Sequence, residues 1–133
     1  MNAQIDVLTP YQWKNCILIV FSESKENSLF KEQNQLFFKH KEGLEERDIV
    51  VLQVFEDGGI ASNQQVITES DIIRLQEKFE FYFSEEDTFA VFLVGKDGGT
   101  KLTSKNKILP IEKLFSVIDA MPMRQREMRE STN

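Results

Sequence analysis

The stretch that decides the fold is Cys16-Ile17-Leu18-Ile19-Val20-Phe21, an uninterrupted apolar run near the start of the chain. It is rich in branched side chains and apolar on both faces, which is typical of a central β-strand covered by helices on both sides. The run is far shorter than the roughly 20 residues that a membrane-spanning helix needs. We therefore predict a strand at the centre of a sheet, and no membrane span.

A helix and a second strand follow this run. Across residues 27–44, apolar side chains recur three or four positions apart, which indicates an amphipathic helix. Residues 49–55 form a second apolar run, ended by Asp57-Gly58-Gly59. The three elements make a βαβ unit, which closes right-handed in nearly every known case.

The second half of the chain predicts a helix, a hairpin and a last helix. Thr68 and Asp71 have the spacing of a capping box at a helix start. Residues 88–96 and 100–104 read as antiparallel strands, joined at an Asp-Gly pair that favours a two-residue turn. Pro110 suits the first turn of the last helix, which must end before Pro122.

The resulting order, βαβ-α-ββα, is the thioredoxin-like arrangement, an α/β fold with a four-strand mixed sheet and helices on both faces. A ferredoxin-like βαββαβ order competes, but it needs a strand after the last helix, where residues 123–133 are polar and charged. We predict a single domain over residues 1–133, with a core of about 12–121 and a charged tail at 122–133. This tail either docks on the domain or frays.

Composition excludes several classes of protein. The chain has 133 residues, a net charge of -6, one cysteine and one histidine. The acidic balance disfavours nucleic-acid binding, which needs a concentrated basic face. One cysteine and one histidine exclude an internal disulfide, a CxxC pair and a multi-histidine metal site, and we predict neither metal nor cofactor. The first ten residues lack the pattern of a signal peptide, so we expect a soluble protein, cytoplasmic or periplasmic.

Four segments carry a resemblance to a known family. They are GKDGGTKL at 95–102, IDAMPMRQREM at 118–128, LEERDIVV at 44–51 and YQWK at 11–14. With these segments the chain resembles a bacterial family of small domains of unknown function, related to domains of equarin-type animal secreted proteins. The resemblance implies a peroxiredoxin-like fold and, by analogy, an oxidoreductase role. Cys16 stands where the family often has arginine and Thr103 where it often has a basic residue, which would weaken a shared anion site.

Thiol chemistry in a thioredoxin-like fold sits between the first strand and the first helix, where helix amides stabilise a thiolate. This loop, residues 22–28, contains no cysteine, and no proline occupies residues 86–89, before the third strand. Ser22, Ser24 and Lys25 either cap the helix or hold an anionic ligand, and capping is the more common use of such residues. Cys16 opens an apolar strand, which favours a buried, inert thiol over a reactive one.

Basic residues gather in two other places. Lys96 and Lys101 lie in the hairpin, and Arg124 lies in the tail. We single out these three, with Arg47 as a further contributor, as candidates for binding a ligand or partner. The alternative is a solvated lysine face.

These observations favour a non-redox binding module that lacks the active-site cysteines. Its partner would be a protein segment or a small anionic ligand, and we name no catalytic residue. The alternative is a peroxiredoxin-like oxidoreductase that uses Cys16 or a thiol supplied by a partner.

Overall fold

The computed structural model describes residues 8–131. Its elements, in chain order, are η1 (Thr9–Tyr11), β1 (Cys16–Ser22), α1 (Ser28–Lys39), α2 (Lys41–Glu46), β2 (Ile49–Val54), β3 (Gly59–Ala61), β4 (Val66–Ile67), α3 (Glu69–Phe79), β5 (Phe89–Val94), β6 (Thr100–Lys105), α4 (Ile111–Asp119) and α5 (Pro122–Ser131). The strands form one mixed sheet in the order β4-β3-β2-β1-β5-β6. The α/β class and the thioredoxin-like order predicted from the sequence are both present.

Strand β1 lies at the centre of this sheet, as predicted, and all seven of its residues are buried. It pairs in parallel with β2, where Cys16 faces Ile49, and antiparallel with β5, where Ile17 faces Val94. The residues that precede β2 and the residues that follow β5 therefore both lie beside Cys16.

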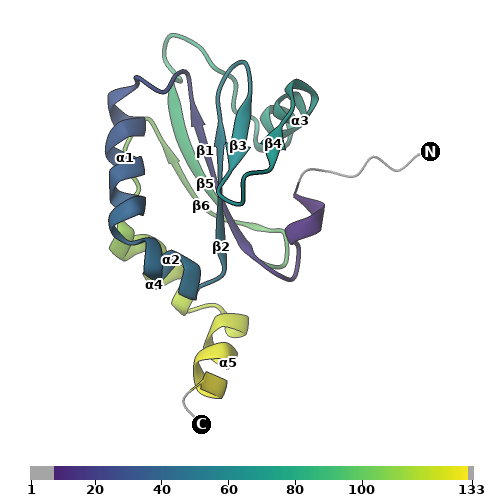
Figure 1. The fold of residues 1–133 in the computed structure, drawn as a ribbon, viewed down its shortest axis with the longest axis vertical. Coiled ribbons are helices and arrows are strands. Elements are labelled where there is room, and N and C mark those ends of the chain that lie inside the picture. Colours follow the sequence, from purple (N-terminus) through teal and green to yellow (C-terminus); the bar gives the residue numbers. More distant parts are fainter. Residues whose placement is uncertain (1–7, 132–133) are drawn as a thin grey trace, which may run out of the picture.

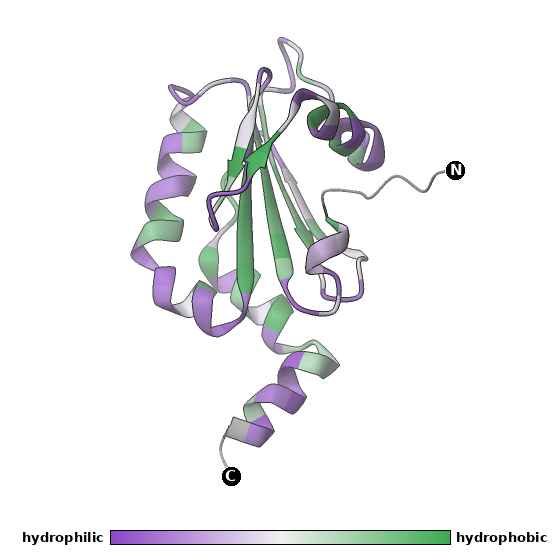
Figure 2. Cartoon of the chain, turned by 45° about the vertical axis from the view of Figure 1, so that its right-hand side comes forward, coloured by the Kyte–Doolittle hydropathy of each residue, from purple (hydrophilic) through white to green (hydrophobic). Residues whose placement is uncertain are grey.

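Helices cover the sheet on two sides (Figure 1). Helices α1, α2 and α4 lie against one face, and α3 with the short η1 lies against the other. The hydropathy colouring of Figure 2 shows mostly hydrophobic strands in the middle of the molecule and helices that carry both hydrophilic and hydrophobic residues. Each face thus has its own hydrophobic core, and β1 contributes alternate residues to both.

The sheet has six strands, so the predicted four-strand sheet is wrong. The additional strands β3 and β4 form a small hairpin at the edge beyond β2. They have three and two residues, too few to show the alternation of apolar and polar side chains by which a strand is recognised in a sequence.

The predicted helix over residues 27–44 is two helices, α1 and α2. His40 has φ -110° and ψ 27°, outside helical geometry, and it ends α1 and begins α2. Both helices bury apolar residues in the same core, Phe37 from α1 and Leu44 from α2. The apolar spacing therefore continues across the break and does not reveal it.

The sequence predicted a capping box at Thr68 and a two-residue hairpin turn, and the structure confirms only the first. At Thr68 the capping box is confirmed, with the Asp71 backbone N–H donating to the threonine hydroxyl and the Thr68 N–H to the aspartate. The β5–β6 turn has three residues, 96–98, rather than two, because Gly98 takes a positive φ of 89° and the Gly95 N–H donates to the Gly99 carbonyl.

Candidate functional site

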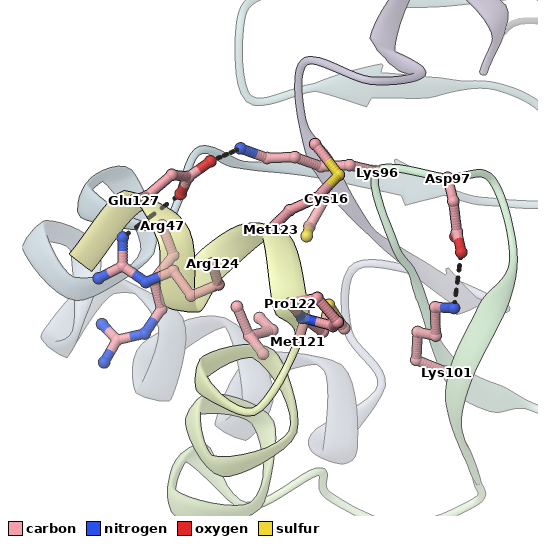
Figure 3. Close-up of a pocket in the computed structure, with 11 residues that line it drawn as sticks. Cys16, Arg47, Lys96, Asp97, Lys101, Met121, Pro122, Met123, Arg124 and Glu127 are labelled. Carbon is pink, nitrogen blue, oxygen red and sulfur yellow. Dashed lines mark hydrogen bonds and ion pairs between the residues drawn. The ribbon is translucent and has the colours of Figure 1, made fainter. Parts of the chain in front are cut away.

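A small pocket lies at the end of the sheet where β1 begins, with a volume of about 80 Å³ (Figure 3). Cys16 opens β1 there, and the strand pairing brings Asp48 and Lys96 to it from the start of β2 and the end of β5. Helices α4 and α5 contribute residues to its lining. Its lining residues are Cys16, Arg47, Lys96, Asp97, Lys101, Ile118, Met121, Pro122, Met123, Arg124 and Glu127.

Four of the candidate residues from the sequence line this one pocket. Arg47 follows α2, Lys96 follows β5, Lys101 lies in β6 and Arg124 lies in α5. Basic side chains from segments as far apart in the sequence as residues 47 and 124 thus surround one pocket with a mostly apolar lining. The resulting surface could receive a ligand with an apolar body and an anionic group.

Arg47 is held by both helices that flank it. Its guanidinium donates two hydrogen bonds to the Asp119 carboxylate, at 3.0 and 2.9 Å, and a third to the Gly43 carbonyl. It also lies over the ring of Phe115, with Cζ 3.8 Å from the centroid. A side chain at Gly43 would collide with that ring, so glycine is what lets α2 approach it.

Arg124 and Lys96 are also paired. Arg124 donates to Asp119 and to Glu46, each at 3.3 Å. Lys96 contacts Asp48 at 3.2 Å and also pairs with Glu127 of α5. We call this set the ion-pair network: Glu46, Arg47, Asp48, Lys96, Asp119, Arg124 and Glu127.

The network shifts the pKa values of three of its members, Arg124, Asp119 and Lys96, and the shifts of Asp119 and Lys96 have clear partners. The hydrogen bonds from Arg47 hold the pKa of Asp119 below its ordinary value, and Arg124 acts in the same direction. Burial alone would lower the pKa of Lys96, but its hydrogen bonds to Glu127 and Asp48 outweigh burial and raise it. Both shifts favour the charged forms that the ion pairs require.

Lys101 differs from the other three cations. It lies at the bulge where β6 leaves register with β5, and its side chain crosses Gly95, where any Cβ would collide with it. Its ammonium pairs with Asp97 at 3.0 Å, and one third of the lysine side chain is exposed, against 10–14% for the other three. Lys101 is therefore the cation that an incoming ligand meets first.

Cys16 lines the pocket with a buried thiol. Its side chain is buried, with 2% of the residue exposed. Burial raises the pKa of the Cys16 thiol, although the nearby Lys96 partly opposes this shift. The raised pKa favours the protonated thiol over the thiolate, and the burial agrees with the buried cysteine expected from its place in an apolar strand.

Ser22, Ser24 and Lys25 lie at the opposite end of β1, away from the pocket. The Ser22 hydroxyl donates to the Ser24 carbonyl at 2.7 Å, and the Lys25 ammonium lies 5.8 Å from the Phe55 ring centre. Asn27 caps α1 by accepting hydrogen bonds from the backbone N–H groups of residues 29 and 30. The cap satisfies these two helix amides, and no cysteine stands in this loop.

Sequence reasoning missed the acidic half of the ion-pair network. Glu127 stands three residues after Arg124, a helical spacing that would have suggested a pair. The pairs of Asp119 with Arg47 and of Glu46 with Arg124 gave no such signal, because they join residues 72 and 78 positions apart. Within residues 8–131, no three histidine, cysteine or acidic side chains are grouped so as to hold a metal ion.

A family model described as "Domain of unknown function (DUF4174)" matches residues 7–127. No curated protein matches the chain in sequence. No helix in the described part of the chain has the length and apolarity to cross a membrane.

Solved structures of peroxiredoxins share the fold. The reduced 2-Cys peroxiredoxin of Plasmodium vivax aligns with a TM-score of 0.62 and 16% identity, over 90% of this chain and 84% of that chain. Thioredoxin peroxidase I of Plasmodium yoelii aligns with a TM-score of 0.59 and 16% identity, over 90% and 79%. AhpC of Mycobacterium tuberculosis aligns with a TM-score of 0.52 and 14% identity, over 84% and 76%. At these identities the likeness establishes a thioredoxin-like fold and nothing about chemistry.

We predict that Asp119→Asn lowers the free energy of unfolding by about 1–2 kcal/mol at neutral pH, because two arginines lose a charged partner. Since the folded-state pKa of Asp119 is depressed, its contribution is present above the ordinary carboxyl pKa and is lost as pH falls through the folded value. Urea unfolding across pH checks this, and the gap between parent and variant should close in acid. Asp57→Asn, at an exposed position, is the matched control. A gap that persists unchanged in acid would contradict the prediction.

Proposed function

The chain belongs to the DUF4174 family, and from that premise we propose that it is a non-redox binding module of thioredoxin-like fold. Its ligand is a protein segment or a small anionic molecule. The observation that carries the proposal is the convergence of Arg47, Lys96, Lys101 and Arg124 around one apolar-walled pocket.

The absence of a redox role is supported at both ends of β1. In the β1–α1 loop, where helix amides would stabilise a thiolate, Asn27 accepts hydrogen bonds from two of those amides and no cysteine is present. At the other end, Cys16 is buried and its pKa is raised. An oxidoreductase working through Cys16 would need an accessible thiolate, which is the opposite arrangement.

The point of contact for an anionic ligand follows from which cations already pair with carboxylates. Arg47, Lys96 and Arg124 are each neutralised by carboxylates of the ion-pair network. Lys101 has Asp97 as its partner, and that carboxylate is half exposed. An anionic group entering from solvent competes most easily at Lys101, while the apolar wall accepts the rest of the ligand.

The remaining parts of the proposal come from the sequence. We propose one domain with a core of about residues 12–121, a cytoplasmic or periplasmic location, a bacterial source, and a relation to equarin-type secreted proteins. Ser22, Ser24 and Lys25 are assigned to the structure of the β1–α1 loop rather than to the pocket.

We predict that Cys16→Ser leaves thiol-dependent activity unchanged. Consumption of a hydroperoxide and reduction of a disulfide substrate should stay at the buffer rate in the parent and in the variant, since the thiol is protonated and enclosed. Circular dichroism verifies that both proteins are folded. Activity in the parent that disappears in the variant would establish the oxidoreductase alternative.

We predict that Lys101→Glu abolishes ligand binding while the fold persists. Isothermal titration calorimetry measures the binding of two probes: butyrate, which joins a carboxylate to a short apolar tail, and a peptide rich in methionine and glutamate. Lys105→Glu, an exposed position on the same strand, is the control and should bind like the parent.

The two probes separate the proposed ligand classes. Saturation by butyrate favours a small anion, and saturation by the peptide favours a protein segment. No saturation of the parent by either probe, or equal binding by Lys101→Glu and the parent, would contradict the proposed function.

A further inference from the structure

Helix α5 is attached to the domain mainly by charge. Among residues 122–130, Arg124 alone is buried, with 9% exposed, and apolar Met123 is 38% exposed. Arg124 joins the helix to the domain through ion pairs with Asp119 and Glu46, and Glu127 does so through its ion pair with Lys96. Because Met123 is left partly exposed, we argue that α5 depends on these ion pairs to stay docked.

The same helix closes the pocket over Cys16. Figure 3 shows Pro122 and Met123 on the α5 side of the pocket and Cys16 on the β1 side, with Glu127 reaching Lys96 above them. The connection to α4 consists of Ala120 and Met121. If α5 swung away on this connection, Cys16 would lose part of its cover and Lys96 would keep only Asp48 from its ion pairs.

We propose that α5 is a strap that opens to uncover the pocket, and that a partner segment of the same chemistry takes its place. This inference rests on the proposed binding function and names both its regulation and its partner. In the closed state, α5 covers the pocket and its Glu127 pairs with Lys96, as a bound ligand would. In the open state, the apolar surface of the pocket is uncovered beside the Lys96 ammonium, which has lost Glu127 and keeps Asp48.

The chemistry of the partner is read from α5 itself. Met123 and Glu127 are four residues apart on the helix and therefore lie on one face. The methionine lines the pocket with Cys16, while the glutamate pairs with Lys96. The partner is accordingly a helical protein segment with an apolar residue followed four positions later by a glutamate.

The strap is tested through the reactivity of Cys16 in the full chain. Glu127→Gln removes the charge that pairs with Lys96, and Glu130→Gln makes the same change at an exposed position of the same helix. The thiol of Glu127→Gln should react with a disulfide reagent roughly tenfold faster than that of the parent, as expected for loss of a charged hydrogen bond. Glu130→Gln should react like the parent, and added sodium chloride should accelerate the parent.

Thermal melting of all three proteins separates local opening from unfolding. Faster reaction with a melting temperature close to that of the parent supports the strap. Equal rates in Glu127→Gln, Glu130→Gln and the parent overturn it, as does acceleration that only follows a collapse in melting temperature.

A second arm tests the partner, using a synthetic peptide with the sequence of residues 122–133. Added to Glu127→Gln, the peptide should slow the reaction of Cys16, whereas the same peptide with glutamine in place of Glu127 should not. If Glu127→Gln reacts faster but neither peptide protects the thiol, the strap stands and the proposed binding of a protein segment is overturned. The two failures are therefore distinguishable.

Discussion

The burial of β1 on both faces is the constraint on which the rest of the structure depends. A strand with no solvent-facing side must pair its backbone groups with neighbours on both edges, and here β2 and β5 provide them. The directions of β2 and β5 decide which end of each strand lies beside which end of β1. The start of β2 and the end of β5 come to Cys16, while at the other end Phe21 packs against Phe81 and Phe92.

This arrangement supports the proposal that the chain is a non-redox binding module. The helix start beside the end of β1 is capped by Asn27, and the only thiol of the chain lies at the opposite end of the strand, where burial raises its pKa. Arg47, Lys96 and Arg124 line the same pocket as that thiol. Their ion pairs join α2, α4 and α5 to the end of the sheet. Lys101 is left at the rim with one exposed carboxylate, which is why we assign ligand contact to it.

Local patterns predicted the parts of the fold that local physics determines. The apolar run of β1, the capping box at Thr68 and the burial of Cys16 each depend on neighbouring residues, and each is found. The short strands β3 and β4 left no local signal, because two or three residues are too few to show a periodicity. The break at His40 left none because α1 and α2 both bury apolar residues in the same core, so the apolar spacing continues across it. The pairs of Asp119 with Arg47 and of Glu46 with Arg124 were missed because only the completed fold brings these residues together.

The most direct test of this account is titration of the Cys16 thiol in the native protein, followed by the ultraviolet absorbance of the thiolate, with Cys16→Ser as the blank. We expect the thiol to stay protonated through neutral pH and to ionise above the ordinary cysteine range, because burial outweighs the attraction of Lys96. A thiolate already present at or below neutral pH would contradict it, and would place an activated cysteine where we infer a structural one.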